Sequence, residues 1–154
     1  MLNTCCFIGH RKITEIEDLK LRLYEIILDL IKNKNIDTFL FGSKSMFDDL
    51  CYEIVTQIKE NRPNIKRIYV RAEYPDINEQ YEKFLLKLYE ETYFPEKIRK
   101  SGKAVYVKRN YEMIDKSNFC VVYYNENNKP TTRKSGTEIA IKYAIKRNKE
   151  IIYL

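Results

Sequence analysis

The sequence predicts an α/β protein of three-layer Rossmann-like type, with helices on both faces of a doubly wound, mostly parallel sheet of about five strands. Short apolar runs alternate along the whole chain with longer segments whose apolar residues recur at helical spacing. The run at residues 119–124 is apolar almost throughout, as is typical of a parallel strand covered on both faces. The 154 residues contain no repeat or low-complexity linker, so we expect a single domain spanning residues 1–154.

Each expected strand is a short apolar run bounded by polar or turn-forming residues. By this pattern, strands lie at residues 2–9, 37–42, 65–71, 119–124 and 150–154. Apolar residues at helical spacing predict helices at residues 14–34, 46–60, 76–91, 111–116 and 136–147. Thr14 is the expected N-cap of the first helix, with Glu17 at the capping-box position, and Pro63 follows the end of the second.

The pattern of apolar residues is less regular between residues 76 and 107. The expected helix at residues 76–91 carries an apolar stripe that contains Tyr81, Phe84, Leu88 and Tyr89. We expect this stripe to pack in the core, and a platform for stacking bases is the weaker alternative. Beyond it, Pro95 breaks regular structure and Gly102 turns the chain. Residues 104–107 favour either a short strand or an extended lid.

Composition limits the class of protein. A hydrophobic content of 44% with 32% charged residues is ordinary for a soluble globular protein. The start of the chain resembles neither a signal peptide nor a membrane span, so we expect a cytoplasmic protein without a membrane partner. The net charge of +6 is interspersed along the sequence and would attract a small anion. Nucleic acid is not the expected partner, because no RNP, KH or helix-turn-helix signature is present; the 13 tyrosines keep that alternative open.

The four cysteines do not suggest a metal site or a disulfide framework. They contain no CxxC pair, and His10 is the only histidine, so we expect neither metal nor cofactor. The simplest interpretation is that all four are small buried apolar residues, at Cys5, Cys6, Cys51 and Cys120. A nucleophilic Cys5 or Cys6 near His10 is the weaker alternative, since strand alternation would bury one of them.

Four polar clusters follow expected strands, and parallel strands bring their carboxyl ends to one edge of the sheet. We therefore expect a ligand site built from Gly9, His10 and Arg11; Gly42, Ser43, Lys44 and Ser45; Arg71 and Glu73; and Lys134, Ser135, Gly136 and Thr137. Free backbone N–H groups at the start of the last helix favour phosphate, and Arg11 can bind phosphate or carboxylate with two hydrogen bonds. Tyrosines beside these loops are the better candidates for stacking on a base, namely Tyr74, Tyr93, Tyr106 and Tyr124.

Each cluster also has a purely structural alternative. Ser135 is a normal helix N-cap, as is either Ser45 or Ser43, and Asp48 is placed to favour a helix dipole. Arg71 and Glu73 could form an ion pair instead of contacting a ligand. His10 is expected to hydrogen-bond to the ligand rather than to act as a general base.

Several blocks of the sequence together resemble the YpsA-like branch of the SLOG superfamily. They are Thr4-Cys5-Cys6-Phe7-Ile8-Gly9-His10-Arg11, Phe39-Leu40-Phe41-Gly42 with Phe47-Asp48, Tyr106-Val107-Lys108-Arg109-Asn110 with Met113 and Ser117, and Gly136-Thr137 before Tyr143-Ala144. The resemblance covers nearly the whole chain. It implies a Rossmann-like domain that binds nucleotides or nucleotide-derived signals and that pairs as a homo-oligomer. It also places Arg109 and Asn110 beside the site, where they could contact a base or hold a loop.

One departure from this superfamily bears on enzymatic activity. The phosphate loop of its phosphoribohydrolases has a glutamate three residues after the threonine, and nucleoside deoxyribosyltransferases place one similarly. Here that position is Ala140, and the neighbouring Glu138 lies on another face of the helix. Cleavage of a glycosidic bond needs a carboxylate at the sugar, so this departure disfavours catalysis without excluding it.

The expected function is therefore binding of a small phosphorylated nucleotide-derived ligand, in a sensor or a sequestering protein. By the resemblance, that ligand could be a cyclic or ADP-ribose-type signal in phage defence or counter-defence. Two alternatives stay open. The first is a nucleotide or nucleoside N-glycosidase, with Glu138, Glu73 and Asp48 as candidate carboxylates. The second is a nucleic-acid or protein interaction domain.

Overall fold

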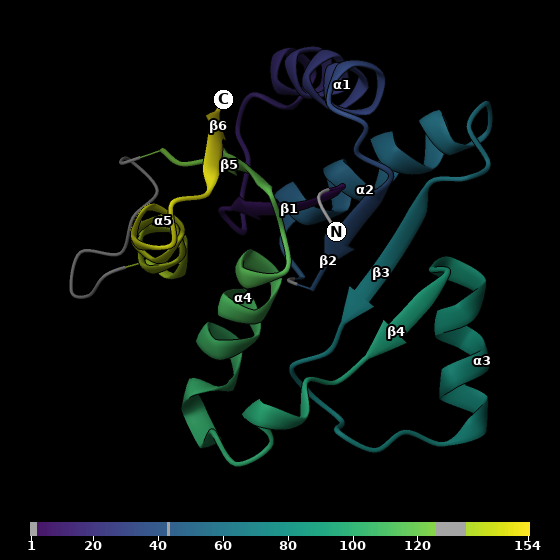
Figure 1. Ribbon diagram of the computed structural model, residues 1–154, viewed down its shortest axis with the longest axis vertical. Helices are drawn as coiled ribbons and strands as arrows, with labels where there is room; N and C mark the ends of the chain where they lie inside the picture. Colours follow the sequence, from purple (N-terminus) through teal and green to yellow (C-terminus); the bar gives the residue numbers. More distant parts are fainter. Residues whose placement is uncertain (1–2, 43, 126–134) are drawn as a thin grey trace.

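The computed structural model describes residues 3–42, 44–125 and 135–154. Within these residues, six strands form one sheet in which every neighbouring pair is parallel, in the order β4-β3-β2-β1-β5-β6 (Figure 1). The strands are β1 (Thr4–Gly9), β2 (Thr38–Phe41), β3 (Lys66–Val70), β4 (Glu91–Tyr93), β5 (Phe119–Tyr123) and β6 (Glu150–Tyr153). The predicted α/β class with a doubly wound parallel sheet is confirmed.

Helices connect the strands. They are α1 (Ile16–Asn33), α2 (Met46–Lys59), α3 (Glu79–Leu88), α4 (Val105–Asp115) and α5 (Gly136–Lys146), with 3₁₀ turns η1 (Glu96–Ile98) and η2 (Gly102–Ala104) before α4. The chain adds β2, β3 and β4 on one side of β1, and β5 and β6 on the other. The strand order therefore reverses between β1 and β5, and open parallel sheets bind ligands outside the carboxyl ends of the strands at such a point.

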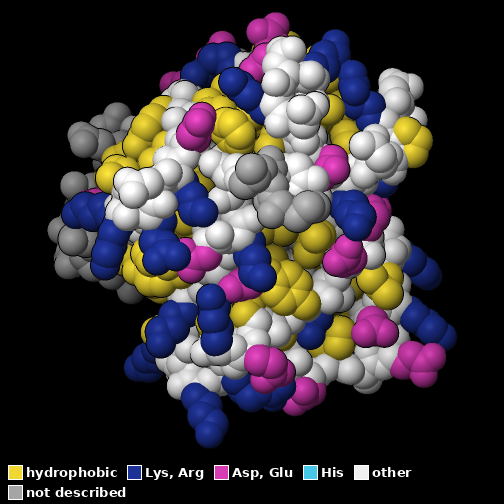
Figure 2. Space-filling view, in the orientation of Figure 1, with side chains coloured by type: hydrophobic (Ala, Val, Ile, Leu, Met, Phe, Trp, Pro, Cys, Tyr) yellow, Lys and Arg dark blue, Asp and Glu magenta, His cyan; other side chains and the backbone are white. Residues whose placement is uncertain are grey.

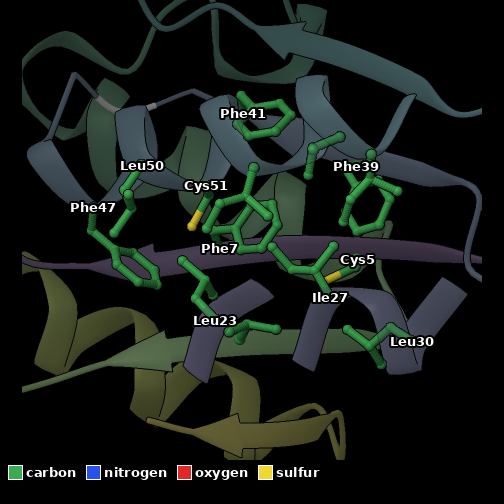
Figure 3. Packing of buried hydrophobic residues seen from close by; sticks show 14 of the residues in the cluster. Cys5, Phe7, Leu23, Ile27, Leu30, Phe39, Phe41, Phe47, Leu50 and Cys51 are labelled. Carbon is green, nitrogen blue, oxygen red and sulfur yellow. The ribbon is translucent and has the colours of Figure 1, made fainter. Parts of the chain in front are cut away.

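Alternating residues of the central strands enter two different apolar cores. Cys5 and Phe7 of β1 pack under α1 and α2, whereas Cys6 and Ile8 pack under α4 and α5. Figure 3 shows the first core, where the Phe7 ring lies between strand and helix side chains and stacks on Phe39 with ring centroids 5.9 Å apart. Burying each such aromatic or aliphatic side chain contributes about 1.5–3 kcal/mol. The strands are covered on both faces, which explains why β1 and β5 read as almost continuous apolar runs.

The edge of the sheet beyond β3 differs from the prediction. A short strand, β4, pairs with β3 at Glu91–Tyr93, where no strand was expected. Residue 104 ends η2 and residue 105 begins α4, so the expected strand or lid at residues 104–107 is wrong, as is a helix beginning only at residue 111.

The predicted core position of the apolar stripe is wrong for Phe84 and Leu88, whereas Tyr89 packs against the first core. Leu85 is the one buried residue of α3, while the side chains of Phe84 and Leu88 are 56% and 38% exposed. The physical reason is the position of α3 beside the three-residue strand β4 at the end of the sheet, where little structure covers it (Figure 1). An amphipathic pattern identifies the apolar face of a helix but not what lies against that face.

Helix starts agree with the sequence at two of three predicted caps. Ser45 and Ser135 are the N-caps of α2 and α5, and each hydroxyl accepts a hydrogen bond of 3.0 Å from a backbone N–H three residues later. The first helix has Glu15 as its N-cap, without a side-chain hydrogen bond, so the predicted Thr14 cap is wrong. Within the described residues, none of the helices combines the length and the apolar character that crossing a membrane requires.

Candidate functional site

A cleft of about 1100 Å³ lies at the carboxyl ends of the central strands, at the point where the strand order reverses. Its walls come from the loop after β1, the loop after β2, the segment after β3, α4 and the start of α5. The described residues that line it include Gly9, His10, Arg11, Lys12, Gly42, Lys44, Ser45, Tyr69, Glu73, Tyr106, Arg109, Asn110, Ser135, Gly136 and Thr137. Most of the predicted site residues are thus brought together. Ser43 and Lys134 lie outside the described residues.

The start of α5 presents backbone donors to the cleft. The first turn of a helix has N–H groups without an intrahelical partner, and the helix dipole makes this end positive. The Ser135 hydroxyl is used as the cap, because it accepts from the N–H of Glu138. A Cβ atom added at Gly136 would meet nothing within 4 Å, so the space above this turn is open. The turn can receive an anion, with the Thr137 hydroxyl beside it.

The loop after β1 lines the same cleft, and its residues have different roles. A Cβ atom at Gly9 would lie 2.2 Å from Cδ2 of Phe47, so packing of β1 against α2 explains this glycine. Arg11 is exposed and lines the cleft, while its carbonyl oxygen accepts from the N–H of Met46 at 2.9 Å. The backbone of Arg11 is therefore anchored, and its side chain lies at the rim of the cleft.

His10 holds two loops together. Its Nε2 accepts a 2.7 Å hydrogen bond from the N–H of Asn125, and its ring packs 5.1 Å from that of Tyr124. Burial lowers the pKa of His10. A neutral imidazole that accepts at Nε2 carries its proton on Nδ1. His10 therefore joins the end of β5 to the end of β1. Its Nδ1–H group is the remaining polar group of the ring and is a hydrogen-bond donor.

Arg109 and Gly42 form the wall between α4 and β2. The buried Arg109 donates from Nη1 to the carbonyl oxygen of Gly42 at 2.5 Å and from Nε to Oδ1 of Asn110 at 3.0 Å. Burial lowers the pKa of Arg109. Of the two interpretations left open for Arg109 and Asn110, these contacts support the structural one, in which they hold a loop.

Asp48 lies below this wall in the first turn of α2. Its side chain is buried, and among the described residues its Oδ1 atom has no hydrogen-bond partner. Burial raises the pKa of Asp48 to about 8, although Arg109 and the backbone of Gly42 act in the opposite direction. At neutral pH this carboxyl group is therefore largely protonated, and it is absent from the described lining of the cleft.

The side chains of Arg71 and Glu73 contact different residues. Arg71 is buried and donates to the carbonyl oxygen of Tyr74 at 3.2 Å and to the hydroxyl of Thr92 at 3.1 Å, so it holds the loop after β3 against β4. Glu73 faces the cleft and accepts a hydrogen bond from the hydroxyl of Tyr106. The ion-pair alternative for Arg71 and Glu73 thus loses its support, and Arg71 is not among the described lining residues.

Several residues that line the cleft were not among the predicted site residues. Tyr69 and Met113 belong to segments that read as apolar core, and Lys12 follows the expected cluster by one position. The sequence offered no separate signal for Tyr69, because it lies inside the expected strand at residues 65–71. Among the tyrosines named as candidates for stacking, Tyr106 lines the cleft.

The cleft carries an excess of positive charge. Arg11, Lys12, Lys44 and Arg109 line it, and Glu73 is the single carboxylate among the described lining residues. Together with the N-terminus of α5, these groups favour an anion over a neutral or cationic ligand. Nowhere in the described residues do three or more His, Cys, Asp or Glu side chains form a group that could hold a metal ion.

The cysteines lie in the core. All four are buried free thiols, as the simplest interpretation predicted. Burial raises the pKa of Cys5 and of Cys51 well above the ordinary value for a thiol. Because a thiolate is the reactive form, the burial and raised pKa of Cys5 count against the nucleophilic alternative. Cys6 is fully buried too, with its Sγ 3.6 Å from that of Cys120.

No protein-family model matches this sequence, and no curated protein matches it.

Proposed function

We propose that this protein binds a small phosphorylated, nucleotide-derived ligand in the cleft at the carboxyl ends of the strands. The observation that carries the proposal is that Arg11 and Thr137, which lie near opposite ends of the sequence, line the same cleft. One supplies a guanidinium and the other belongs to a helix N-terminus, and both groups favour phosphate.

The dimensions and chemistry of the cleft suit such a ligand. Small-molecule sites are commonly clefts of about 300–1,000 Å³, and this one is of comparable size at about 1100 Å³. The turn at Gly136 would hold a phosphate, with Arg11 and Lys44 balancing its charge. The rings of Tyr69 and Tyr106 offer apolar surface for a base.

The biological role belongs to the same proposal. The resemblance to the YpsA-like branch of the SLOG superfamily supports a sensor or a sequestering protein for a nucleotide-derived signal. A cyclic or ADP-ribose-type messenger of phage defence or counter-defence, a cytoplasmic location and pairing of two chains all rest on that resemblance.

One observation favours a second candidate, an N-glycosidase acting on a nucleotide or nucleoside. Glu73 places a carboxylate in the cleft, hydrogen-bonded to Tyr106. The other two candidates are less well placed, because Asp48 is buried below the cleft and Glu138, which is partly buried, lies outside the described lining. Release of a free base from AMP or GMP, followed by chromatography and abolished in Glu73→Gln, would support this activity.

The binding proposal is tested by titration calorimetry with AMP, GMP, CMP, UMP and ADP-ribose. We expect at least one of these to bind, and Arg11→Ala to weaken its Kd about tenfold or more, because a charge-assisted hydrogen bond contributes about 1.5–3 kcal/mol. The matched control is Arg22→Ala, since Arg22 is exposed on α1 and pairs with Asp18 at 3.2 Å. Equal affinities of Arg11→Ala and Arg22→Ala would contradict the assignment of Arg11.

A further inference from the structure

A second hollow continues the cleft between α4 and α5. It measures about 340 Å³ and is lined by Tyr111, Ile139, Lys142, Tyr143 and Lys146, which we call the tyrosine groove. Ile139 lines both the cleft and the tyrosine groove. Asn110, which lines the cleft, immediately precedes Tyr111. The two hollows therefore adjoin, and a ligand anchored at the start of α5 could extend along the helix into the second.

The tyrosine groove contains an ordered aromatic surface. The rings of Tyr111 and Tyr143 are stacked, with centroids 3.8 Å apart and planes 14° from parallel. The Tyr143 hydroxyl lies 2.9 Å from both carboxylate oxygens of Asp115, and the Arg147 guanidinium lies 5.9 Å from the ring centroid. A tyrosine pair held in this way loses little conformational entropy when a third ring stacks on it.

The positive charge of the protein is concentrated in the same part of the chain. Residues 91–154 contain 14 of the 28 Lys and Arg residues but only 7 of the 22 Asp and Glu residues. Charges of both signs are interspersed along the chain, but the net positive charge lies in residues 91–154. Figure 2 shows Lys and Arg side chains gathered over the region of α4 and α5. Lys142 and Lys146 line the tyrosine groove, and its described lining includes no carboxylate.

We propose that the tyrosine groove is a second subsite for a base and its phosphate, so that the ligand is a dinucleotide rather than a mononucleotide. This inference rests on the proposed function, because the first nucleotide must occupy the cleft. The second base stacks on the tyrosine pair, as bases do on aromatic side chains in single-strand binding sites. Its phosphate lies between the ammonium groups of Lys142 and Lys146 and the positive start of α5.

The test compares mononucleotides with the corresponding 5′-phosphorylated dinucleotides, AMP with pApA and GMP with pGpG, by titration calorimetry. We expect one dinucleotide to bind wild type at least about tenfold more tightly than its mononucleotide, since stacking of one base contributes about 1–3 kcal/mol. In Lys142→Glu/Lys146→Glu we expect this advantage to disappear, with the mononucleotide Kd changed less than about threefold. The matched control is Lys32→Glu/Lys34→Glu, which makes the same charge change at the exposed end of α1 and should preserve the advantage.

The tyrosine pair is tested separately from its packing role. Tyr111→Phe keeps a ring on Tyr143 and should keep the dinucleotide advantage, whereas Tyr111→Ala should lose it at unchanged mononucleotide affinity. Mononucleotide binding without any dinucleotide advantage in wild type would overturn the second subsite and leave the proposed function standing. Failure of these four probes to bind, together with failure of CMP, UMP and ADP-ribose, would overturn both.

Discussion

The guanidinium of Arg109 donates a 2.5 Å hydrogen bond from Nη1 to the carbonyl oxygen of Gly42, and thereby ties α4 to the end of β2. A Cβ atom at residue 42 would lie 2.8 Å from Cδ of Arg109 and 2.9 Å from Sδ of Met113. Helix α4 can approach the sheet this closely only because residue 42 is a glycine. The contact places one wall of the cleft.

This contact makes Gly42→Ala a destabilising substitution. The added methyl group must displace Arg109 or Met113, and overpacking of this kind costs about 1–3 kcal/mol of the free energy of unfolding. Urea denaturation measures the loss. Gly136→Ala is the control, because its Cβ atom would meet nothing within 4 Å, and it should be neutral or stabilising by up to about 1 kcal/mol. Equal changes in the free energy of unfolding at the two glycines would show that the close approach of α4 to residue 42 does not contribute to stability.

Asp48 should give the stability a measurable pH dependence. Its pKa is about 8 in the folded protein, whereas an unfolded aspartate titrates near pH 3.9. Between these values the folded state binds more protons than the unfolded state, so the free energy of unfolding falls as the pH rises from about 4 to about 8. Each unit of pKa difference corresponds to about 1.4 kcal/mol.

The measurement is the difference in unfolding free energy between wild type and Asp48→Asn over this pH range. We expect wild type to lose stability relative to the variant by at least about 1 kcal/mol as the pH rises. His10 contributes with the opposite sign, because its lowered pKa costs stability as the pH falls through about 6.5. That contribution is common to both proteins and cancels. A difference independent of pH would mean that Asp48 is ionised in the folded state.

Two adjacent residues of α3 test the correction made to the apolar stripe. Leu85 is 4% exposed and Phe84 is 56% exposed. Leu85→Ala should lower the free energy of unfolding by about 2–5 kcal/mol, as is usual for a core leucine. Phe84→Ser should change it by less than about 0.5 kcal/mol. Thermal or urea unfolding of both variants measures the two changes in the free energy of unfolding. A larger loss of stability in Phe84→Ser than in Leu85→Ala would show that Phe84 belongs to the core.

Most of the fold could be predicted because its local signals agree with its packing. The run at residues 119–124 predicted β5, since a strand covered on both faces has few polar residues. The serine caps at Ser45 and Ser135 predicted two helix starts. The edge at β4 could not be predicted in the same way, because a three-residue strand depends on pairing with β3 more than on its own sequence.

The candidate site shows a similar limit. Parallel topology alone indicated that the loops after the strands would meet at one edge, and they line one cleft. The sequence could not show which polar residues the fold itself uses. Arg71 and His10 look like ligand-binding residues, yet each makes hydrogen bonds that hold a loop. The glycine at residue 9 is required by Phe47, a neighbour far along the chain.

The central claim is that Arg11 and the start of α5 bind one anion together. The most direct measurement is a ¹⁵N NMR titration of the protein with AMP, GMP, CMP and UMP. We expect at least one nucleotide to shift the amide signals of both Arg11 and Thr137 along a single saturation curve. If both signals stay unmoved by all four, or if one of them shifts while the other does not, the two loops do not form a common phosphate site.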